Sequence, residues 1–454
     1  MLCTHRENLS KFGLYFFFHQ SARIFMKHRL LLPVCVLLCN LFFTNLLFAQ
    51  CGDRYMSPIF SSVTTVANVQ YGSNITAEGQ NKILQFDFYE PQGDTLSARP
   101  LIILAHGGTF VAGDENSADI VFLCQEFAKR GYACASINYR LLSTTYAITA
   151  MLSGQLTNVF FDEVVKAVTD MRAAIRYFRQ DAATGNAYRI DPNQIFVGGA
   201  SAGAITAIHA AYLSSESDFD NYTLAGVVPM DYINSNGGFE GTSGNAGYSS
   251  AVSGIINLCG ALGSVTFMQA GEVPVVSLHG DADSVVPYGT GSANAFGIPV
   301  IQVDGSLIVH QRADELNIPN DLLTFPGEDH MAHDNPANRP QSVAFITNFL
   351  YNLVDCSNLQ VGITPAVHTA AQAGIALYPN PAGYGTEVTL SFTGFGNQQV
   401  TVQLYNQLGQ KIWQTNAPAG SMITMETANL PAGMYEVIAT DGKQMSSRKL
   451  MVAR

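Results

Sequence analysis

Gly199-Ala200-Ser201-Ala202-Gly203 is the stretch of this sequence that most strongly restricts the fold. Residues 194–197 before it have the pattern of a buried strand, and residues 202–212 after it have the pattern of a helix. A serine between small residues at a sharp strand-to-helix turn exposes its Oγ, and the helix presents its N-terminus to a developing oxyanion. The stretch therefore predicts that Ser201 is a nucleophile; the alternative is an ordinary glycine-rich turn.

Strands and helices alternate on both sides of this turn. The expected strands are residues 66–71, 83–89, 101–105, 133–137, 194–197, 225–229, 273–278 and 321–325. The expected helices are residues 119–130, 162–180, 202–212 and 337–353. This order predicts an α/β fold with a mostly parallel sheet that begins with an edge hairpin. Residues 143–161 and 231–272 do not fit the alternation and are expected to be insertions over a substrate cleft.

A glycine-containing loop, His106-Gly107-Gly108-Thr109-Phe110, follows the strand at 101–105. Glycine lets backbone N–H groups approach a substrate carbonyl oxygen closely. We assign the oxyanion donors to Gly108 and Thr109, with the N–H of Ala202 as the third. His106 is expected to orient the loop by hydrogen bonds. A tight turn without a catalytic role is the alternative.

Acidic residues follow the strand at 273–278, in His279-Gly280-Asp281-Ala282-Asp283. A carboxylate at this edge of the sheet can orient a catalytic imidazole and stabilise its charged form. Asp283 is preferred because it lies further along the loop, whereas Asp281 can serve as a turn residue. Asp231, just after the expected strand 225–229, is a third candidate. The Asp-x-Asp spacing lacks the further ligands of a calcium site.

Two histidines follow the last expected strand, in Glu328-Asp329-His330-Met331-Ala332-His333. His330 lies nearer the strand end and is the preferred general base, whereas His333 is expected to be a surface or supporting residue. A two-histidine metal site would require a carboxylate at helical spacing, which this pattern does not offer. No metal and no other cofactor is therefore expected.

The N-terminal region has the pattern of an export signal. Met26-Lys27-His28-Arg29 is basic, residues 30–48 are apolar, and Ala49 provides a small residue for cleavage. This order predicts a signal peptide that starts at Met26 and is cleaved after Ala49. The apolar stretch is also long enough for a transmembrane anchor. Acylation of Cys51 is a weaker alternative, because Gln50 is not small.

Composition narrows the class of protein. The 454-residue length fits one large and one small domain, and 47% hydrophobic with 13% charged residues supports a packed core. The net charge of −12 comes without a dense Lys/Arg run, so no nucleic-acid partner is expected. The cysteines that follow the signal are Cys51, Cys124, Cys134, Cys259 and Cys356. Because their number is odd, at least one thiol is unpaired within the chain. The others can form disulfides in an exported protein or be buried as free thiols.

The character of the sequence changes near residue 357. Residues 357–374 are small and polar without periodicity, which predicts a linker. Short alternating strands at 388–392, 400–405, 411–414 and 435–440 then predict a small all-β sandwich. The expected organisation is an N-terminal extension and signal (1–49), a catalytic domain (50–356), a linker (357–374) and the β-sandwich (375–454).

These motifs together resemble the α/β-hydrolase superfamily, specifically its carboxylesterase-like and lipase-like members, over about residues 60–355. The shared order along the chain is Ser201, Asp283, then His330. The loop departs from many lipase-like relatives, since Thr109 stands where they carry a third glycine. Other matching segments are 137–141, 170–174 and 279–287. The resemblance implies a serine carboxylic ester hydrolase that acts on small-molecule or polymer-borne esters through a Ser-His-Asp triad and an acyl-enzyme intermediate.

The C-terminal segment resembles the type A sorting domain of the type IX secretion system of Bacteroidetes. The motifs are Leu377-Tyr378-Pro379-Asn380-Pro381, Leu430-Pro431-Ala432-Gly433-Met434-Tyr435 and Lys449-Leu450-Met451-Val452. The resemblance implies export through the periplasm by the type IX machinery, to the medium or the cell surface. The alternative is a β-sandwich that binds carbohydrate or spaces the enzyme.

Two other functions are compatible with the same motifs. One is a serine peptidase of the same fold, and the other is a non-catalytic surface binding protein on a degenerate hydrolase fold. The intact set of Ser201, Asp283 and His330 favours the hydrolase.

Overall fold

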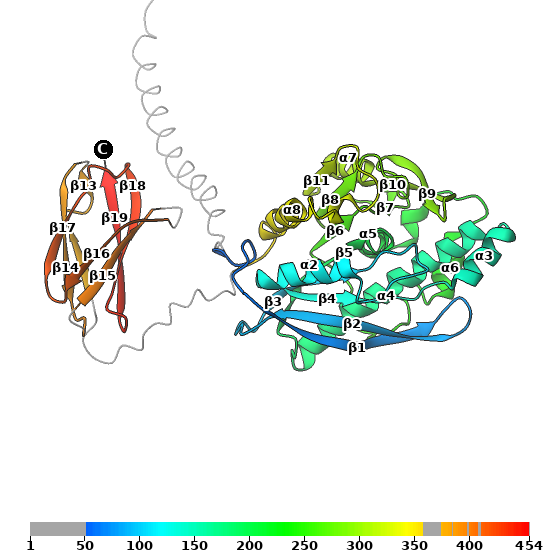
Figure 1. Ribbon diagram of the computed structural model, residues 1–454, viewed down its shortest axis with the longest axis horizontal. Coiled ribbons are helices and arrows are strands. Elements are labelled where there is room, and N and C mark those ends of the chain that lie inside the picture. Colours follow the sequence, from blue (N-terminus) through cyan, green and yellow to red (C-terminus); the bar gives the residue numbers. More distant parts are fainter. Residues whose placement is uncertain (1–50, 357–373, 384, 397–398, 407–409, 454) are drawn as a thin grey trace, which may run out of the picture. The chain divides into compact units, whose positions relative to one another are not determined.

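A computed structural model describes residues 51–356, 374–383, 385–396, 399–406 and 410–453 (Figure 1). The predicted signal (1–49) and residues 357–373 of the predicted linker lie outside the described residues. The chain divides into two compact units, Met1–Leu359 and Gln360–Arg454, and each is described by itself. Within the described residues, no helix combines the length and apolar character that a membrane span needs.

The first unit is built on an eight-stranded sheet with the order β1-β2-β4-β3-β5-β6-β8-β11. Strand β2 runs antiparallel to β1 and β4, and all other neighbouring pairs are parallel. This arrangement confirms the predicted α/β fold class and the edge hairpin. The strands are β1 (Val63–Ile75), β2 (Asn81–Pro91), β3 (Arg99–Ala105), β4 (Ala133–Ile137), β5 (Ile190–Ala200), β6 (Gly254–Leu258), β8 (Val275–Gly280) and β11 (Asn320–Phe325).

Helices cover both faces of the sheet, because successive strand residues point to opposite sides. Ile103 of β3 belongs to a buried cluster with α4 and α5, whereas Ile102 belongs to another with α2 and α8. Parallel strands buried on both faces have nearly continuous apolar sequences, as β3 does. The α-helices are α2 (Ala118–Lys129), α3 (Thr144–Leu152), α4 (Leu156–Thr184), α5 (Ala202–Tyr212), α6 (Pro229–Ser235), α7 (Ser306–Leu316) and α8 (Arg339–Tyr351). Short 3₁₀ helices are Glu216–Phe219, Val265–Phe267 and Ala332–Asp334.

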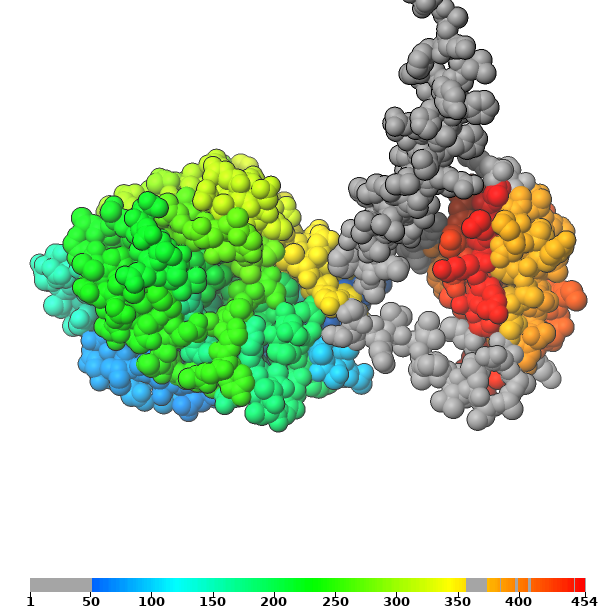
Figure 2. Space-filling model, turned by 180° about the vertical axis from the view of Figure 1, so that it is seen from behind, coloured from blue at the N-terminus to red at the C-terminus, as the bar shows by residue number. Residues whose placement is uncertain are grey.

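Two sequence predictions in the middle of this unit are wrong. The strand expected at 225–229 is only an isolated bridge between Leu224 and Val227, and Pro229 begins α6, where proline's fixed φ is favourable. Strand β6 lies inside 231–272, the segment expected to be an insertion. Residues 143–161 form α3 and the start of α4. The connection between α5 and β6, residues 213–253, contributes to the bright green part of the surface of the first unit in Figure 2.

A second, three-stranded sheet with the order β7-β10-β9 was not predicted. Its paired strands are antiparallel, and two of them give little periodic signal because β7 has only two residues and β9 consists mainly of small ones. They are β7 (Ala261–Leu262), β9 (Thr290–Ala295) and β10 (Ile298–Gly305).

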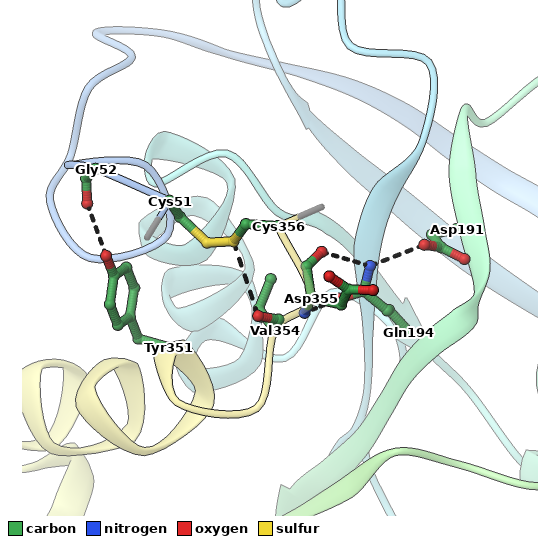
Figure 3. Close-up of a disulfide and its surroundings, with 8 residues drawn as sticks. All are labelled: Cys51, Gly52, Asp191, Gln194, Tyr351, Val354, Asp355 and Cys356. Atoms are coloured by element: carbon green, nitrogen blue, oxygen red, sulfur yellow. Dashed lines mark hydrogen bonds between the residues drawn. A yellow bond between two sulfur atoms is a disulfide. The ribbon is translucent and has the colours of Figure 1, made fainter. Parts of the chain in front are cut away.

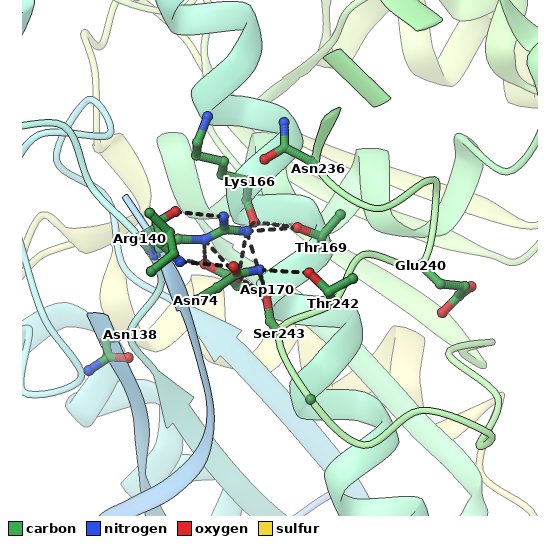
Figure 4. Close-up of polar contacts among 12 residues, drawn as sticks. Asn74, Asn138, Arg140, Lys166, Thr169, Asp170, Asn236, Glu240, Thr242 and Ser243 are labelled. Carbon is green, nitrogen blue, oxygen red and sulfur yellow. Dashed lines mark hydrogen bonds and ion pairs between the residues drawn. The ribbon is translucent and has the colours of Figure 1, made fainter. Parts of the chain in front are cut away.

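A buried ion pair joins two of the segments that carry the resemblance to α/β-hydrolases, residues 137–141 and 170–174 (Figure 4). The guanidinium of Arg140 and the carboxylate of Asp170 are 2.9 Å apart, with side chains 2% and 0% exposed. Arg140 also donates to the Thr169 hydroxyl, and Ser243 donates to Asp170. Removing one partner of such a pair would leave an uncompensated buried charge, so these segments fix α4 against the loop after β4.

Glu163 on α4 is a buried carboxyl group outside this network. Its side chain has no hydrogen-bond partner among the described residues. Burial raises the pKa of Glu163 to about 8, with Asp162 and Asp170 acting in the same direction and Lys166 and Arg140 opposing them.

Glu163→Gln is therefore expected to stabilise the protein at pH 8. The folded state keeps a proton that the unfolded state loses above its pKa of 4.5, so wild-type stability falls as pH rises from 4.5 towards 8. The isosteric amide removes this dependence and recovers up to a few kcal/mol at pH 8. Urea unfolding at pH 5 and pH 8 measures the effect, with the exposed Glu315→Gln as control. Parallel pH profiles for wild type and Glu163→Gln would refute it.

A disulfide joins the first described residue to the last one before the linker (Figure 3). Cys51 and Cys356 are bonded across 305 residues, with a Cα–Cα distance of 5.4 Å. The bond engages the Cys51 sulfur, so acylation at this position is not supported. Nearby, the Tyr351 hydroxyl donates to the Gly52 carbonyl at 3.1 Å. Cys124, Cys134 and Cys259 are free and buried.

Cys51→Ser together with Cys356→Ser is expected to lower the free energy of unfolding by about 2–5 kcal/mol, because the bond restricts a very long loop in the unfolded chain. Denaturant unfolding of the double variant measures the loss. Wild type treated with a reductant should match it, and the Cys124→Ser variant should respond to reductant as wild type does. An unchanged denaturation midpoint in the double variant would refute the prediction.

The second unit contains two sheets of short strands, whose paired strands are antiparallel except for β13 and β19, which run parallel. Alternate residues of β14 are buried, namely Val388, Leu390 and Phe392, and they pack in one core with β15 and β18. This is the predicted β-sandwich. The first sheet has β12 (Gly374–Tyr378), β14 (Glu387–Thr393) and β17 (Met422–Glu426). The second has β13 (Ala382–Gly383), β19 (Met445–Ala453), β18 (Gly433–Thr440), β15 (Gln399–Tyr405) and β16 (Lys411–Pro418).

Candidate active site

Ser201 lies at the sharp turn between β5 and α5. Its backbone is held at φ 53° and ψ −115°, a strained conformation for a residue with a side chain. The Ser201 N–H donates to the Leu258 carbonyl at 2.8 Å. A Cβ added at Gly199 or Gly203 would lie 2.4 or 2.1 Å from the Ala105 carbonyl oxygen. Both glycines are therefore needed for the turn to pack against the end of β3.

His330 connects Ser201 to Asp283. Its Nε2 is 2.9 Å from the Ser201 Oγ, and its Nδ1 is 2.7 Å from the Asp283 Oδ2. Asp283 lies in the loop after β8, and His330 lies in the loop after β11. The structure thus brings together the three residues that the sequence selected, in the geometry that lets an imidazole accept a hydroxyl proton.

The Asp283 carboxylate is held as an anion. Burial opposes ionisation, but hydrogen bonds from His279, His330 and the Val286 amide hold the pKa of Asp283 well below its usual range. Its Oδ1 accepts from the amides of Val285 and Val286 at 2.8 and 2.9 Å. These amides fix the carboxylate so that the other oxygen faces His330.

The charged form of His330 is favoured in turn. Although burial opposes protonation, the hydrogen bonds and charges of Asp283 and Cys259 raise the pKa of His330 above its usual value. An anion at Nδ1 stabilises the imidazolium that would form when Nε2 accepts a proton from Ser201.

The two other candidate acids lie elsewhere. Asp281 is exposed, and its carboxylate accepts the Gly327 amide at 2.6 Å, which is the turn role considered for it. Asp231 lies exposed in the first turn of α6. The strand on which its candidacy depended, at 225–229, does not form.

Cys259 was not selected from the sequence. It directly follows β6, in a left-handed conformation with φ 45°. Burial raises the pKa of the Cys259 thiol, but the imidazoles of His330 and His333 outweigh it and lower the pKa to about 5. His333 is 4% exposed, so the surface position considered for it is wrong. A correct placement of β6 would have drawn attention to Cys259 at its carboxyl end.

The loop at 106–110 lies against the nucleophile. A Cβ at Gly107 would be 3.4 Å from the Ser201 Cβ, and Gly108 and Thr109 have φ of 113° and 55°. Thr109 and Ala202 line the cavity beside Ser201, whereas Gly108 is not among its lining residues.

His106 orients this loop, as the sequence predicts. Its Nδ1 donates to the Gly107 carbonyl at 2.6 Å, and its ring stacks on Tyr139 at 4.4 Å between centroids. The Tyr139 hydroxyl donates to the His106 carbonyl at 2.8 Å.

An apolar cavity of about 90 Å³ opens beside Ser201. Two polar side chains in its wall, those of Arg172 and His209, are already hydrogen-bonded to the backbone. Arg172 donates to the carbonyls of Ala210, Leu213 and Phe239, and burial lowers the pKa of His209 to about 4, so that ring is neutral. The wall is otherwise mainly apolar and includes Phe110, Phe160, Ile205, Phe267, Val286 and Ala295. These residues come from segments far apart in the sequence, so sequence reasoning did not find the cavity.

The sheet, the elbow and the flanking helices give the first unit an α/β-hydrolase fold. Residues 86–235 match the model of the BD-FAE family, an esterase family of this type. Residues 376–453 match the secretion system C-terminal sorting domain. The chain thus combines a segment similar to BD-FAE esterases, on an α/β-hydrolase fold, with a sorting-domain segment that indicates export to the surface or the medium. The BD-FAE match includes Ser201 and ends before Asp283 and His330.

Solved structures with a related fold include two esterases. One is Thermogutta terrifontis esterase 2 phosphoramylated by tabun, with 18% identity, a TM-score of 0.44, and coverage of 64% of this chain and 95% of that chain. The other is a truncated carbohydrate esterase from gut microbiota, with 20% identity, a TM-score of 0.43, and coverage of 64% and 98%. A search of curated proteins found no match.

Proposed function

We propose that this protein is an exported serine carboxylic ester hydrolase that works through Ser201, His330 and Asp283. The observation that carries the proposal is the unbroken chain from the Ser201 Oγ through both ring nitrogens of His330 to Asp283, at the wall of an apolar cavity. A fixed nucleophile, a base and an orienting carboxylate are the parts that acyl transfer requires.

In the proposed reaction, His330 Nε2 accepts the Ser201 proton while Oγ attacks the ester carbonyl carbon. Asp283 stabilises the imidazolium, and the backbone N–H groups of Gly108, Thr109 and Ala202 donate to the oxyanion. His330 then protonates the leaving alcohol, which leaves an acyl-enzyme on Ser201. A water molecule, deprotonated by His330, attacks this ester, and His330 returns the proton to the Ser201 Oγ as the acid leaves.

Because the cavity beside Ser201 is mainly apolar, we propose that the enzyme prefers esters with an apolar acyl group. We expect kcat/KM for p-nitrophenyl esters to rise about fourfold per added CH₂ from acetate until the cavity is filled, since each buried methylene contributes about 0.8 kcal/mol. The Ala293→Leu variant, which narrows the cavity, should reduce this gain, while Ala337→Leu on the exposed surface should not. Faster cleavage of aminoacyl-anilides than of any ester would contradict the esterase and favour the peptidase.

The sorting domain of the second unit supports a route of export for the enzyme. We propose that its sorting domain directs the chain through the periplasm to the type IX machinery, after which it is released or attached at the surface.

A further inference from the structure

Four neighbouring strands of the sheet, in the order β5-β6-β8-β11, end at the candidate active site. Three of them lead to the residues already described, and the fourth, β6, leads to Cys259. The carbonyl before Cys259 accepts the Ser201 amide, and the Cys259 amide donates to the Leu278 carbonyl at 2.9 Å. The backbone therefore fixes Cys259 between the nucleophile turn and the end of β8.

The side chain of Cys259 meets two members of the triad. Cys259, Asp283 and His330 each present one ligand atom, and these atoms lie within 4.8 Å of one another. Thiolate, imidazole and carboxylate are the three protein ligand types of Zn²⁺. We propose that Cys259, Asp283 and His330 form a site for Zn²⁺ that inhibits the enzyme.

His333 strengthens this assignment independently. It is 4% exposed, and neither of its ring nitrogens has a hydrogen-bond partner of proper geometry among the described residues. Unsatisfied buried nitrogens are rare and costly, and this imidazole acts electrostatically on Cys259. His333 lies outside the group of ligand atoms within 4.8 Å, so its ring would have to turn towards the ion to complete tetrahedral coordination as a fourth ligand.

Inhibition follows from the chemistry of the imidazole and rests on the proposed esterase function. If Zn²⁺ takes Nε2 of His330, the base has no lone pair for the Ser201 proton. If it takes Nδ1, the neutral ring carries its proton on Nε2 and again cannot accept one. Binding requires Cys259 as the thiolate and His330 as the neutral ring, so any proton that either group holds is released to solvent.

The approach to the site passes His330. The side chain of His330 is 17% exposed, whereas that of Asp283 is fully covered and Cys259 is buried. The imidazole must move for Zn²⁺ to enter, so inhibition should develop slowly after mixing.

The test measures hydrolysis of a p-nitrophenyl ester during incubation with Zn²⁺, followed by a chelator. Wild type should lose activity over time and regain it with the chelator. For Cys259→Ala, compared with its own metal-free rate, half-inhibition should need at least about tenfold more Zn²⁺. The matched control is Cys124→Ala, a second free and buried thiol, which should remain as sensitive as wild type. Equal sensitivity of wild type and Cys259→Ala would overturn the site.

A second readout does not depend on catalysis. Co²⁺ bound at this site should give an intense thiolate-to-metal charge-transfer band with one ion per chain, and the band should be absent in Cys259→Ala. His333→Asn should weaken Co²⁺ binding. Co²⁺ binding without the thiolate band would refute the site even if the esterase is active. The band in a chain without esterase activity would retain the site and reject the proposed function.

Discussion

Ser201→Ala is expected to lower kcat for ester hydrolysis by about 10⁴- to 10⁶-fold. The substitution removes the Oγ that lies 2.9 Å from His330 and leaves the cavity and the His330–Asp283 pair in place. KM should change little, because the acyl group of the substrate still binds in the same apolar cavity. Initial rates with a p-nitrophenyl ester measure the loss.

Covalent labelling separates the nucleophile from a merely structural serine. A fluorophosphonate should label wild type and fail to label Ser201→Ala. Ser284→Ala, whose hydroxyl donates to Asp329 at 2.9 Å near the site, should be labelled as wild type is. An unlabelled wild type, or equal labelling of Ser201→Ala, would reject the esterase and favour a non-catalytic surface binding protein.

Asp283→Asn is the second large effect, with an expected loss in kcat of about 10⁴-fold. The carboxylate accepts two backbone amides at one oxygen and His330 Nδ1 at the other. An amide NH₂ facing Nδ1 would favour the wrong tautomer, with the proton on Nε2. The same ester assay measures the loss, and circular dichroism checks that the fold is retained.

Asp281→Asn is the matched control for this position. Its carboxylate accepts the Gly327 amide in the turn and makes no hydrogen bond to the triad among the residues that the structure describes, so kcat should stay within about threefold of wild type. A large loss in Asp281→Asn together with a small loss in Asp283→Asn would reverse the assignment of the acid.

The predictable part of this molecule was local. The elbow at 199–203, the loop at 106–110 and the acid loop carry their information in consecutive residues at strand ends, so their positions followed from an α/β sheet. Strand β6 was not predicted, because its five residues are too few to show a period and lie within a Ser-, Gly- and Asn-rich segment. The apolar residues at 225–229 have the pattern of a short strand, but no strand forms there, and Pro229 begins helix α6.

The rest depended on tertiary packing. Cys259 approaches His330 only because β6 lies between β5 and β8, an order that sequence spacing does not encode. His333 has the same local sequence signal as His330, and only the fold places one ring near the Ser201 Oγ and the other beside Cys259. The cavity likewise needs side chains from α4, α5 and β10 at once.

The bond between Cys51 and Cys356 also decides how the first unit would respond to a mechanical load. Its two ends are covalently tied, so a pull applied along the chain from residue 357 reaches Cys51 directly. The tension would pass through the disulfide and bypass the backbone between Cys51 and Cys356, which forms α8 and the sheet. A motor that draws this protein by its C-terminal segment, with its N-terminal end held, would therefore stretch a sulfur–sulfur bond before it could peel away the strand ends that hold the triad.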